Sequence, residues 1–403
     1  MELFWLEHKK LWRKKIVKIC VLLCFVYCVI FGSILSFQWF SFGSSDDYTS
    51  AFGNNFDGYT VIKDSQEYAL SFGGELTDET LQQIVSDYQQ MEADGMEEEL
   101  EKTDWQIVNS WLGTLYPELR DTNNYKTMIS YVDPDKLTGF YERRRQVLDE
   151  FLEVSGQVGA EKEYLHQIER KVEKPFHYEW VEGWSTLLGS MVADLGVVMA
   201  LFLGIVLSSL FAGEWHDNTS TLVLTTRNGW GKIALAKILT GLAFTVELFA
   251  LLAVSNVISQ LFFMGTAGWD MPIQNIKLIA VAPMNMLQAE IYEYAFVLLG
   301  AIGFAGIVMF ISAAVKNNVL TLLLSLAVVY GPMMIAEYLP YEMQKALDLI
   351  PLVGSSTDIF RTNTFRIFGK LIWSPYLLIT IPVLIGILCM PFAIKSWSRR
   401  MKA

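Results

Sequence analysis

Two carboxylates that interrupt long apolar runs are the side chains most able to do chemistry in this sequence. Asp194 follows the start of one run, and Glu247 lies near the middle of another. A carboxylate at the centre of a membrane helix costs roughly 2.5–3.5 kcal/mol, so it usually faces protein or water. Asn256 and Gln260 make the end of the second run polar as well. These four residues are candidates for a polar pathway between helices; alternatively, each carboxylate is buried and protonated, or bonded to a neighbouring helix.

No set of residues matches a catalytic or metal-binding pattern. The four histidines are scattered, and neither an HExxH nor a GxSxG motif is present. The nearest approach to a phosphate-binding loop, GWGKI at 229–233, lacks the leading Gly and the final Ser or Thr. Cys20, Cys24 and Cys28 share one helix face and are better explained as small packing residues than as a metal site. We therefore predict no catalytic residue, no metal ligand and no cofactor in this chain.

The composition predicts an integral membrane protein with one water-exposed domain. The chain has 403 residues, of which 52% are hydrophobic, and its mean hydropathy is +0.32. The apolar residues are concentrated near the N-terminus and in the second half, with a polar block between them. Residues 41–180 hold 29 acidic and 12 basic residues, and all four cysteines lie outside this block. We therefore expect no disulfide in it.

The acidic balance excludes some partners and favours others. A chain with a net charge of −12 has no basic surface typical of nucleic-acid binding. The acidic block could attract a cationic peptide substrate, although a solvated acidic surface is the simpler explanation. The basic triplet 143–145 is expected to lie on a solvated helix face.

Six apolar runs are long enough to cross a membrane as helices. They cover Ile16–Phe40, Leu187–Phe211, Ile233–Met264, Tyr294–Val315, Val319–Ala336 and Pro375–Ile394. The basic residues before the first run, in the loop after the second, at Lys316 and at the C-terminus place these segments in the cytoplasm by the positive-inside rule. Basic residues after the fifth run, Lys345, Arg361, Arg366 and Lys370, are the exception. Close helix approach is expected at Gly300, Gly303 and Gly306 of the fourth run.

These features predict an all-α polytopic membrane protein. Residues 1–40 form an interfacial "elbow" helix, with six basic residues among apolar ones, and the first span. Residues 41–180 form a mostly helical extracellular domain, and 181–403 form spans two to six with a cytoplasmic loop at 212–232. In the domain, Thr77 caps one helix. Asp133–Pro134 starts a second, which we expect to run past Gly156 and Gly159 as a long arm.

The elbow and the loop after the second span resemble those of ABC-2 type transporter permeases. The start MELFWLEHKKLWRKK is similar to their elbow helix. The loop has a Glu at the membrane exit and a small Thr-bearing turn, followed by a Leu-rich helix, an Arg and a Lys entering span three. These residues are Glu214, Asn218, Thr219, Leu222, Leu224, Arg227 and Lys237, and Leu349–Ile350–Pro351 before the last span is also similar. The family's Pro near the Arg is absent.

The resemblance implies a permease subunit of a bacterial exporter that moves a peptide or other amphipathic substrate. The loop, with Lys232 near its end, would be a coupling helix seated on a separate ATPase subunit that binds ATP and Mg²⁺. A second permease, identical or paralogous, and the lipid of the bacterial cytoplasmic membrane would be the other partners. A different function remains open: a membrane sensor or scaffold whose extracellular domain binds a ligand and signals to a cytoplasmic partner without transport.

Overall fold

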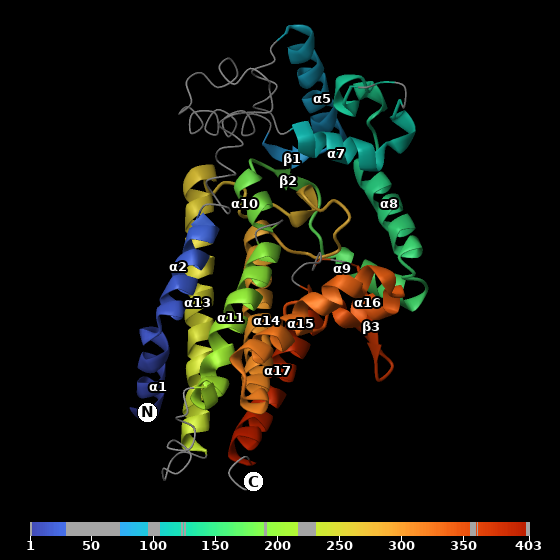
Figure 1. Cartoon of the computed structure of the whole chain (residues 1–403). Helices are drawn as coiled ribbons and strands as arrows, with labels where there is room; N and C mark the ends of the chain where they lie inside the picture. Colours follow the sequence, from blue (N-terminus) through green and yellow to red (C-terminus); the bar gives the residue numbers. More distant parts are fainter. Residues whose placement is uncertain are drawn as a thin grey trace.

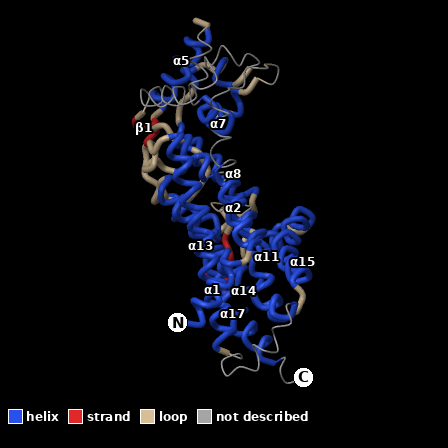
Figure 2. The backbone as a smooth tube through the Cα atoms, turned by 60° about the vertical axis from the view of Figure 1, so that its left-hand side comes forward, coloured by secondary structure: helices blue, strands red, loops and turns tan. Residues whose placement is uncertain are grey.

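The computed structural model describes residues 2–29, 73–95, 105–121, 124, 126–188, 192–216, 231–354, 360 and 362–399. The chain is mostly helical and elongated, with a bundle of long helices at one end and a polar domain at the other (Figures 1 and 2). Both chain termini lie at the end of the bundle away from the polar domain (Figure 1). We call this the terminal end, and the opposite end of the bundle the domain end.

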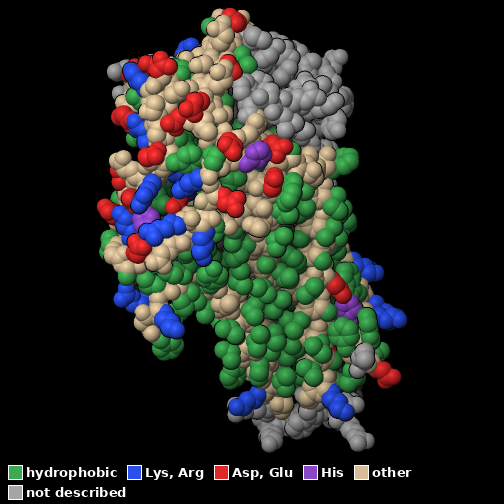
Figure 3. Space-filling view, turned by 180° about the vertical axis from the view of Figure 1, so that it is seen from behind, with side chains coloured by type: hydrophobic (Ala, Val, Ile, Leu, Met, Phe, Trp, Pro, Cys, Tyr) green, Lys and Arg blue, Asp and Glu red, His purple; other side chains and the backbone are tan. Residues whose placement is uncertain are grey.

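Five described helices are long and apolar enough to cross a membrane. They are α11 (Val192–His216), α13 (Lys232–Met264), α14 (Met286–Val315), α15 (Asn318–Ile335) and α17 (Ser374–Arg399). The predicted first span corresponds to α2 (Lys15–Val29), which follows α1 (Glu2–Arg13). Residues 30–40 of that span lie outside the described residues, so the sixth crossing stays a prediction. Apolar side chains cover the face of the bundle seen in Figure 3, which is the surface expected of helices in lipid.

The helix α14 is the centre of the bundle, because α11 and α17 pack along it. Glycines allow this close approach: a Cβ added at Gly306 would lie 2.4 Å from the backbone oxygen of Gly386 in α17, and one at Gly303 would lie 2.3 Å from that of Pro382. Any larger side chain would force these two helices apart. The predicted role of Gly303 and Gly306 is confirmed, whereas a Cβ at Gly300 would meet Leu352 of the connection before α17, at 3.1 Å, and not a helix.

The fourth span was predicted to begin at Tyr294, and this boundary is wrong by two turns. The helix begins at Met286, where the Asn285 side chain accepts from the Gln288 N–H and the Gln288 side chain accepts from the Asn285 N–H. This reciprocal capping box satisfies two backbone donors that a helix start leaves open. Two buried carboxylates, Glu290 and Glu293, consequently lie inside the helix.

Over its described residues, the polar domain contains short helices and one small sheet. Its elements are β1 (Gly74–Leu76), α5 (Asp78–Ala93), α7 (Trp105–Leu115), η2 (Pro117–Leu119), η3 (Met128–Ser130), η4 (Pro134–Lys136), α8 (Phe140–Val154), α9 (Ala160–Glu169), β2 (Phe176–Tyr178) and α10 (Glu182–Thr186). The strands β1 and β2 pair antiparallel with Glu75 opposite His177, so the sheet closes the domain next to the bundle (Figure 1). The Thr77 cap of α5 is confirmed, since its hydroxyl accepts from the Thr80 N–H.

The long arm expected from Asp133 past Gly159 is broken into three pieces. Asp133–Pro134 starts only the single turn η4, and α8 begins later, after Gly139 in the left-handed region at φ 73°. The Asp78 carboxylate of α5 accepts hydrogen bonds from the N–H groups of Gly139 and Phe140, at 2.6 and 2.9 Å. A distant residue therefore caps α8, which local pattern does not reveal. Gly156, at φ 74°, then ends the helix.

One member of the basic triplet is a buried anchor, which corrects the prediction of a solvated face. The Arg144 side chain is fully buried and pairs with Glu169 at 2.6 Å. It also donates to the backbone oxygens of Leu278 and Ala280, at 2.7 and 3.1 Å. Since these carbonyls belong to the connection between α13 and α14, Arg144 fastens the polar domain to the bundle. The neighbouring Arg145 is exposed as expected.

The connection between α15 and α17 forms a side lobe at the domain end (Figure 1). It contains η7 (Ala336–Tyr338), α16 (Tyr341–Leu347), β3 (Thr364–Ile367) and β4 (Lys370–Trp373), and η6 (Ile273–Asn275) lies in the connection between α13 and α14. Two of its basic residues are paired with carboxylates, Lys345 with Glu342 at 2.9 Å and Arg366 with Glu161 at 2.5 Å. Two of the four basic residues that depart from the positive-inside pattern are thus paired with carboxylates, whereas Lys370 is exposed and Arg361 lies outside the described residues.

Candidate functional site

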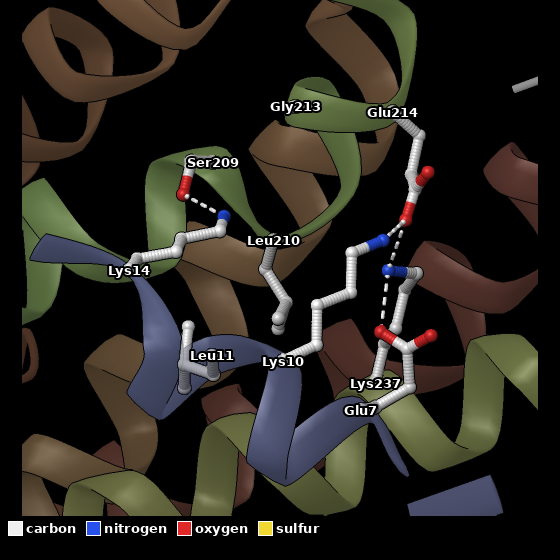
Figure 4. A pocket seen from close by; sticks show the side chains of 9 residues that line it. All are labelled: Glu7, Lys10, Leu11, Lys14, Ser209, Leu210, Gly213, Glu214 and Lys237. Atoms are coloured by element: carbon white, nitrogen blue, oxygen red, sulfur yellow. Dashed lines mark hydrogen bonds and ion pairs between the residues drawn. The ribbon is translucent and has the colours of Figure 1, made fainter. Parts of the chain in front are cut away.

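The N-terminal helix α1 meets the two helix ends that flank residues 217–230, and this junction is the candidate site (Figure 4). α1 is amphipathic, and its residues Glu7, Lys10 and Leu11 follow a helical spacing that puts them on one face. Leu11 is buried on this face. α11 ends at His216 and α13 begins at Lys232, so both helices point their ends at the same place.

The junction contains a buried network of ion pairs. The Lys237 ammonium lies 2.8 Å from Glu7 Oε2 and 2.9 Å from Glu214 Oε1. The Lys10 ammonium lies 2.6 Å from the same Glu214 oxygen (Figure 4). Lys237 and Glu214 are only 2% and 4% exposed, whereas Lys10 is 53% exposed. Two cations thus meet two carboxylates, and three separate helices supply them.

Because its members are buried, the network is costly to break but adds little stability when it is complete. Moving an ion out of water costs several kcal/mol, and the attraction of its partner compensates only when the geometry is good. Removing one partner leaves an uncompensated buried charge, which typically costs 3–5 kcal/mol. The ends of α11 and α13 are therefore fixed to α1 and to one another as long as all four side chains are present.

Further polar contacts continue the junction along α1. The Lys14 ammonium donates to the Ser209 hydroxyl of α11 at 2.9 Å. His8 lies 3.2 Å from a Glu247 oxygen, and the Trp12 indole N–H donates to the other at 3.0 Å. A hollow of about 20 Å³ lies between the three helices, lined by Glu7, Lys10, Leu11, Lys14, Ser209, Leu210, Gly213, Glu214 and Lys237. It has room for about one water molecule, so it is a joint and not a substrate cavity.

The structure brings together two of the seven residues predicted for ATPase coupling. Glu214 and Lys237 pair directly. Lys232 is exposed at the start of α13, five residues before Lys237 and apart from the network. Four other residues, Thr219, Leu222, Leu224 and Arg227, lie outside the described residues.

The four intramembrane candidates do not form one pathway. Glu247 faces α1, whereas Asn256 and Gln260 are buried, and the Asn256 amide donates to the Tyr294 hydroxyl of α14 at 3.1 Å. Nine residues separate Glu247 from Asn256, which is two and a half helical turns and puts them on opposite sides of α13. Asp194 is exposed near the start of α11. The structure therefore shows no single continuous path through these four residues.

Two residues of the network, Glu7 and Lys10, were not predicted. They were treated as part of a basic interfacial helix, and Glu7 was not recognised as the partner of a distant lysine. The available signal was the presence of a carboxylate inside a strongly basic helix. Within the described ranges, no group of three His, Cys, Asp or Glu side chains is suited to a metal ion.

Comparison of the chain with protein-family models, with curated proteins and with solved structures found no match.

Proposed function

We propose that this chain is the membrane-spanning subunit of an ATP-driven exporter in the bacterial cytoplasmic membrane. Separate subunits would bind ATP and Mg²⁺, and the segment between α11 and α13 would be where they act. The observation that carries the proposal is the buried network of Glu7, Lys10, Glu214 and Lys237. This network ties the ends of α11 and α13 to α1, so that the three helices would move together. It lies directly beside that segment.

Such a junction is suited to transmit a movement from a soluble ATPase subunit to the membrane helices. Displacing the segment at residues 217–230 would displace α11 and α13 together, because the Glu214–Lys237 pair ties them. α11 packs along α14, the centre of the bundle, so the movement would reach the packed core. Packed helices move between discrete arrangements, which is how small shifts at one end become a change of access at the other.

The distribution of charge supports an orientation with the terminal end in the cytoplasm. Basic residues gather there: those of α1, Lys232 at the start of α13, Lys316 after α14, and Lys395 near the end of α17. Acidic side chains are frequent on the polar domain (Figure 3). The positive-inside rule then makes the polar domain extracellular, and its acidic surface would favour a cationic peptide as the substrate.

The sensor or scaffold function is favoured by a different observation, the anchor at Arg144. Arg144 ties α8 of the polar domain to the connection that enters α14. A ligand that shifted α8 could signal through this anchor without transport. The two functions differ in whether the terminal end binds an ATPase.

Site-specific crosslinking in native membranes tests the proposal. A photoreactive amino acid replaces Leu222 or Leu224, and another replaces Ser86 of α5 at the far end of the polar domain as the control. We expect an ATPase with a phosphate loop to crosslink to the first two positions and not to the control. Reversal of charge at Arg227, or Leu222→Pro, should then abolish substrate-stimulated ATP hydrolysis while membrane insertion is retained. Capture of other proteins only, with no ATPase at either position, would favour the sensor.

A further inference from the structure

The side lobe ends in a β-hairpin whose tip is a single exposed aromatic residue. β3 and β4 pair antiparallel, with Ile367 opposite Lys370, so Phe368 and Gly369 form the turn. The Phe368 side chain is fully exposed. Its backbone lies in the left-handed region at φ 49°, which is strongly disfavoured for a bulky side chain. Asn, Asp or Gly would suit this turn better in water.

The base of the hairpin is held firmly, so the tip is a fixed projection. The Thr364 hydroxyl donates to Gln157 Oε1 at 2.8 Å, and Arg366 pairs with Glu161 of α9. On the other face of the hairpin, the Lys345 ammonium lies 5.4 Å from the centre of the Phe365 ring. The polar domain and α16 therefore contact both faces of the hairpin, and the turn projects from it with the exposed Arg366 and Lys370 beside it.

The hairpin points along the bundle, toward the terminal end, beside the helices that would cross the membrane (Figure 1). β4 runs from the turn back to Trp373, and α17 begins at the next residue. Four strand residues span about 13 Å, so the turn reaches that far below the start of α17. At this level α17 exposes the apolar Leu384, and the exposed Leu388 follows one helical turn further along. The turn thus lies beside a surface that faces acyl chains.

We propose that the hairpin turn inserts into the bilayer leaflet next to the polar domain, with Phe368 among the acyl chains. Lys370, exposed beside the turn, would place its charged end at a lipid phosphate, since long basic side chains extend from apolar surroundings to polar ones. Anionic phospholipid is the partner that this combination of apolar tip and basic flank fits. Through Arg366 and Thr364 the hairpin would tether α9, and with it the polar domain, to the membrane surface.

This inference does not depend on ATP hydrolysis or on transport. It depends on the bundle crossing a membrane and on the position of the turn. A soluble partner or a second copy of the chain could cover Phe368 instead, and the experiment separates these occupants from lipid.

Fluorescence of a label at residue 368 in lipid nanodiscs tests the proposal. The native Cys20, Cys24, Cys28 and Cys389 are first replaced by Ala, and Phe368→Cys is labelled with the environment-sensitive fluorophore NBD. Ser86→Cys, exposed on α5 far from the bundle, is the water reference, and Leu388→Cys on α17 is the lipid reference. Lys370→Cys serves as a second probe of the turn, in case the label at 368 prevents folding. Folding of each variant is checked by gel filtration.

We expect the label at 368 to be quenched by nitroxide groups on acyl chains and protected from aqueous iodide, as at 388. In nanodiscs that contain phosphatidylglycerol, Lys370→Glu should weaken this insertion about fivefold. A label at 368 that iodide quenches as strongly as at 86 would overturn the proposal. Protection from iodide without quenching by lipid nitroxides would overturn it too, because a protein surface would then cover the turn.

Discussion

Two cationic side chains, Arg144 and Lys237, are buried at opposite ends of the bundle, and they hold their surroundings by different means. Arg144 is fully buried and reaches two backbone carbonyls as well as the Glu169 carboxylate. Lys237 is 2% exposed and reaches only side chains, the carboxylates of Glu7 and Glu214. The planar guanidinium suits several fixed acceptors, whereas the ammonium is a compact point charge.

The difference indicates how each end of the bundle is held. Backbone carbonyls cannot titrate or change rotamer, so the anchor at Arg144 fixes the polar domain rigidly on the connection between α13 and α14. The pKa of Arg144 is lowered by burial, which Glu169 opposes. The network around Lys237 consists of side chains from three helices and includes the exposed Lys10. It ties helices to one another through side chains alone, so it holds α1, α11 and α13 together without fixing them to a backbone connection.

The largest expected effect is the loss of the rigid anchor through Arg144→Met. This change removes the fully buried partner of Glu169, which keeps only the partly exposed Lys174, and the side-chain donor of the Leu278 carbonyl, so the free energy of unfolding should fall by about 3–5 kcal/mol. Chemical denaturation in detergent measures it, with Arg145→Met, an exposed neighbour, as the control. A loss below about 1 kcal/mol would mean that the polar domain is not held by this contact.

Lys237→Met should cost less, about 2–3 kcal/mol, because Lys10 still pairs with Glu214. The double variant with Glu7→Gln should recover part of this loss, since it removes the carboxylate that Lys237→Met leaves without its cation. The same denaturation assay applies, with Lys232→Met at the exposed start of α13 as the control. Equal stability of the single and double variants would show that Lys237 and Glu7 are not coupled.

Acid should loosen the domain end through Glu169. Burial raises the pKa of this carboxyl, but hydrogen bonds from Lys174 and Arg144 outweigh burial and hold the pKa below its usual value of 4.5. The stability that ionised Glu169 contributes is therefore complete above about pH 4.5 and is lost as the pH falls through the lowered value. Amide hydrogen exchange between pH 6 and 3 should show α8 and α9 opening at low pH. The variant Glu169→Gln should lack this step, and an unchanged pH profile in that variant would contradict the assignment.

The smallest effect is expected at the edge of the joint, from Glu247→Gln. Glu247 is 43% exposed and contacts His8 and the Trp12 indole. Partly exposed pairs contribute about 1 kcal/mol or less, so the free energy of unfolding should change by no more than that. Trp12→Phe, which removes the N–H and keeps the ring packed near Phe244, is the matched variant. A cost similar to that of Lys237→Met would place Glu247 in the core of the joint.

The sequence predicted the long helices better than their polar partners. The boundaries of α13, α15 and α17 agree with the apolar runs within a few residues, apart from the C-terminal end of α17. The start of α14 was misplaced because its first two turns contain Glu290 and Glu293, which look like a loop by composition. Helical period alone could have shown that Glu247 and Asn256 lie on opposite sides of α13.

The sequence by itself determined which segments are apolar enough to leave water and which form the acidic domain, because these properties depend on local composition. Only the tertiary structure decided which charges meet. Glu7 and Lys237 are 230 residues apart, and Asp78 caps a helix that begins 62 residues later. A buried charge requires a partner, but in the sequence alone any of several opposite charges would satisfy that requirement. The packing of the helices selects one, because only there do the donor and acceptor come within hydrogen-bond distance.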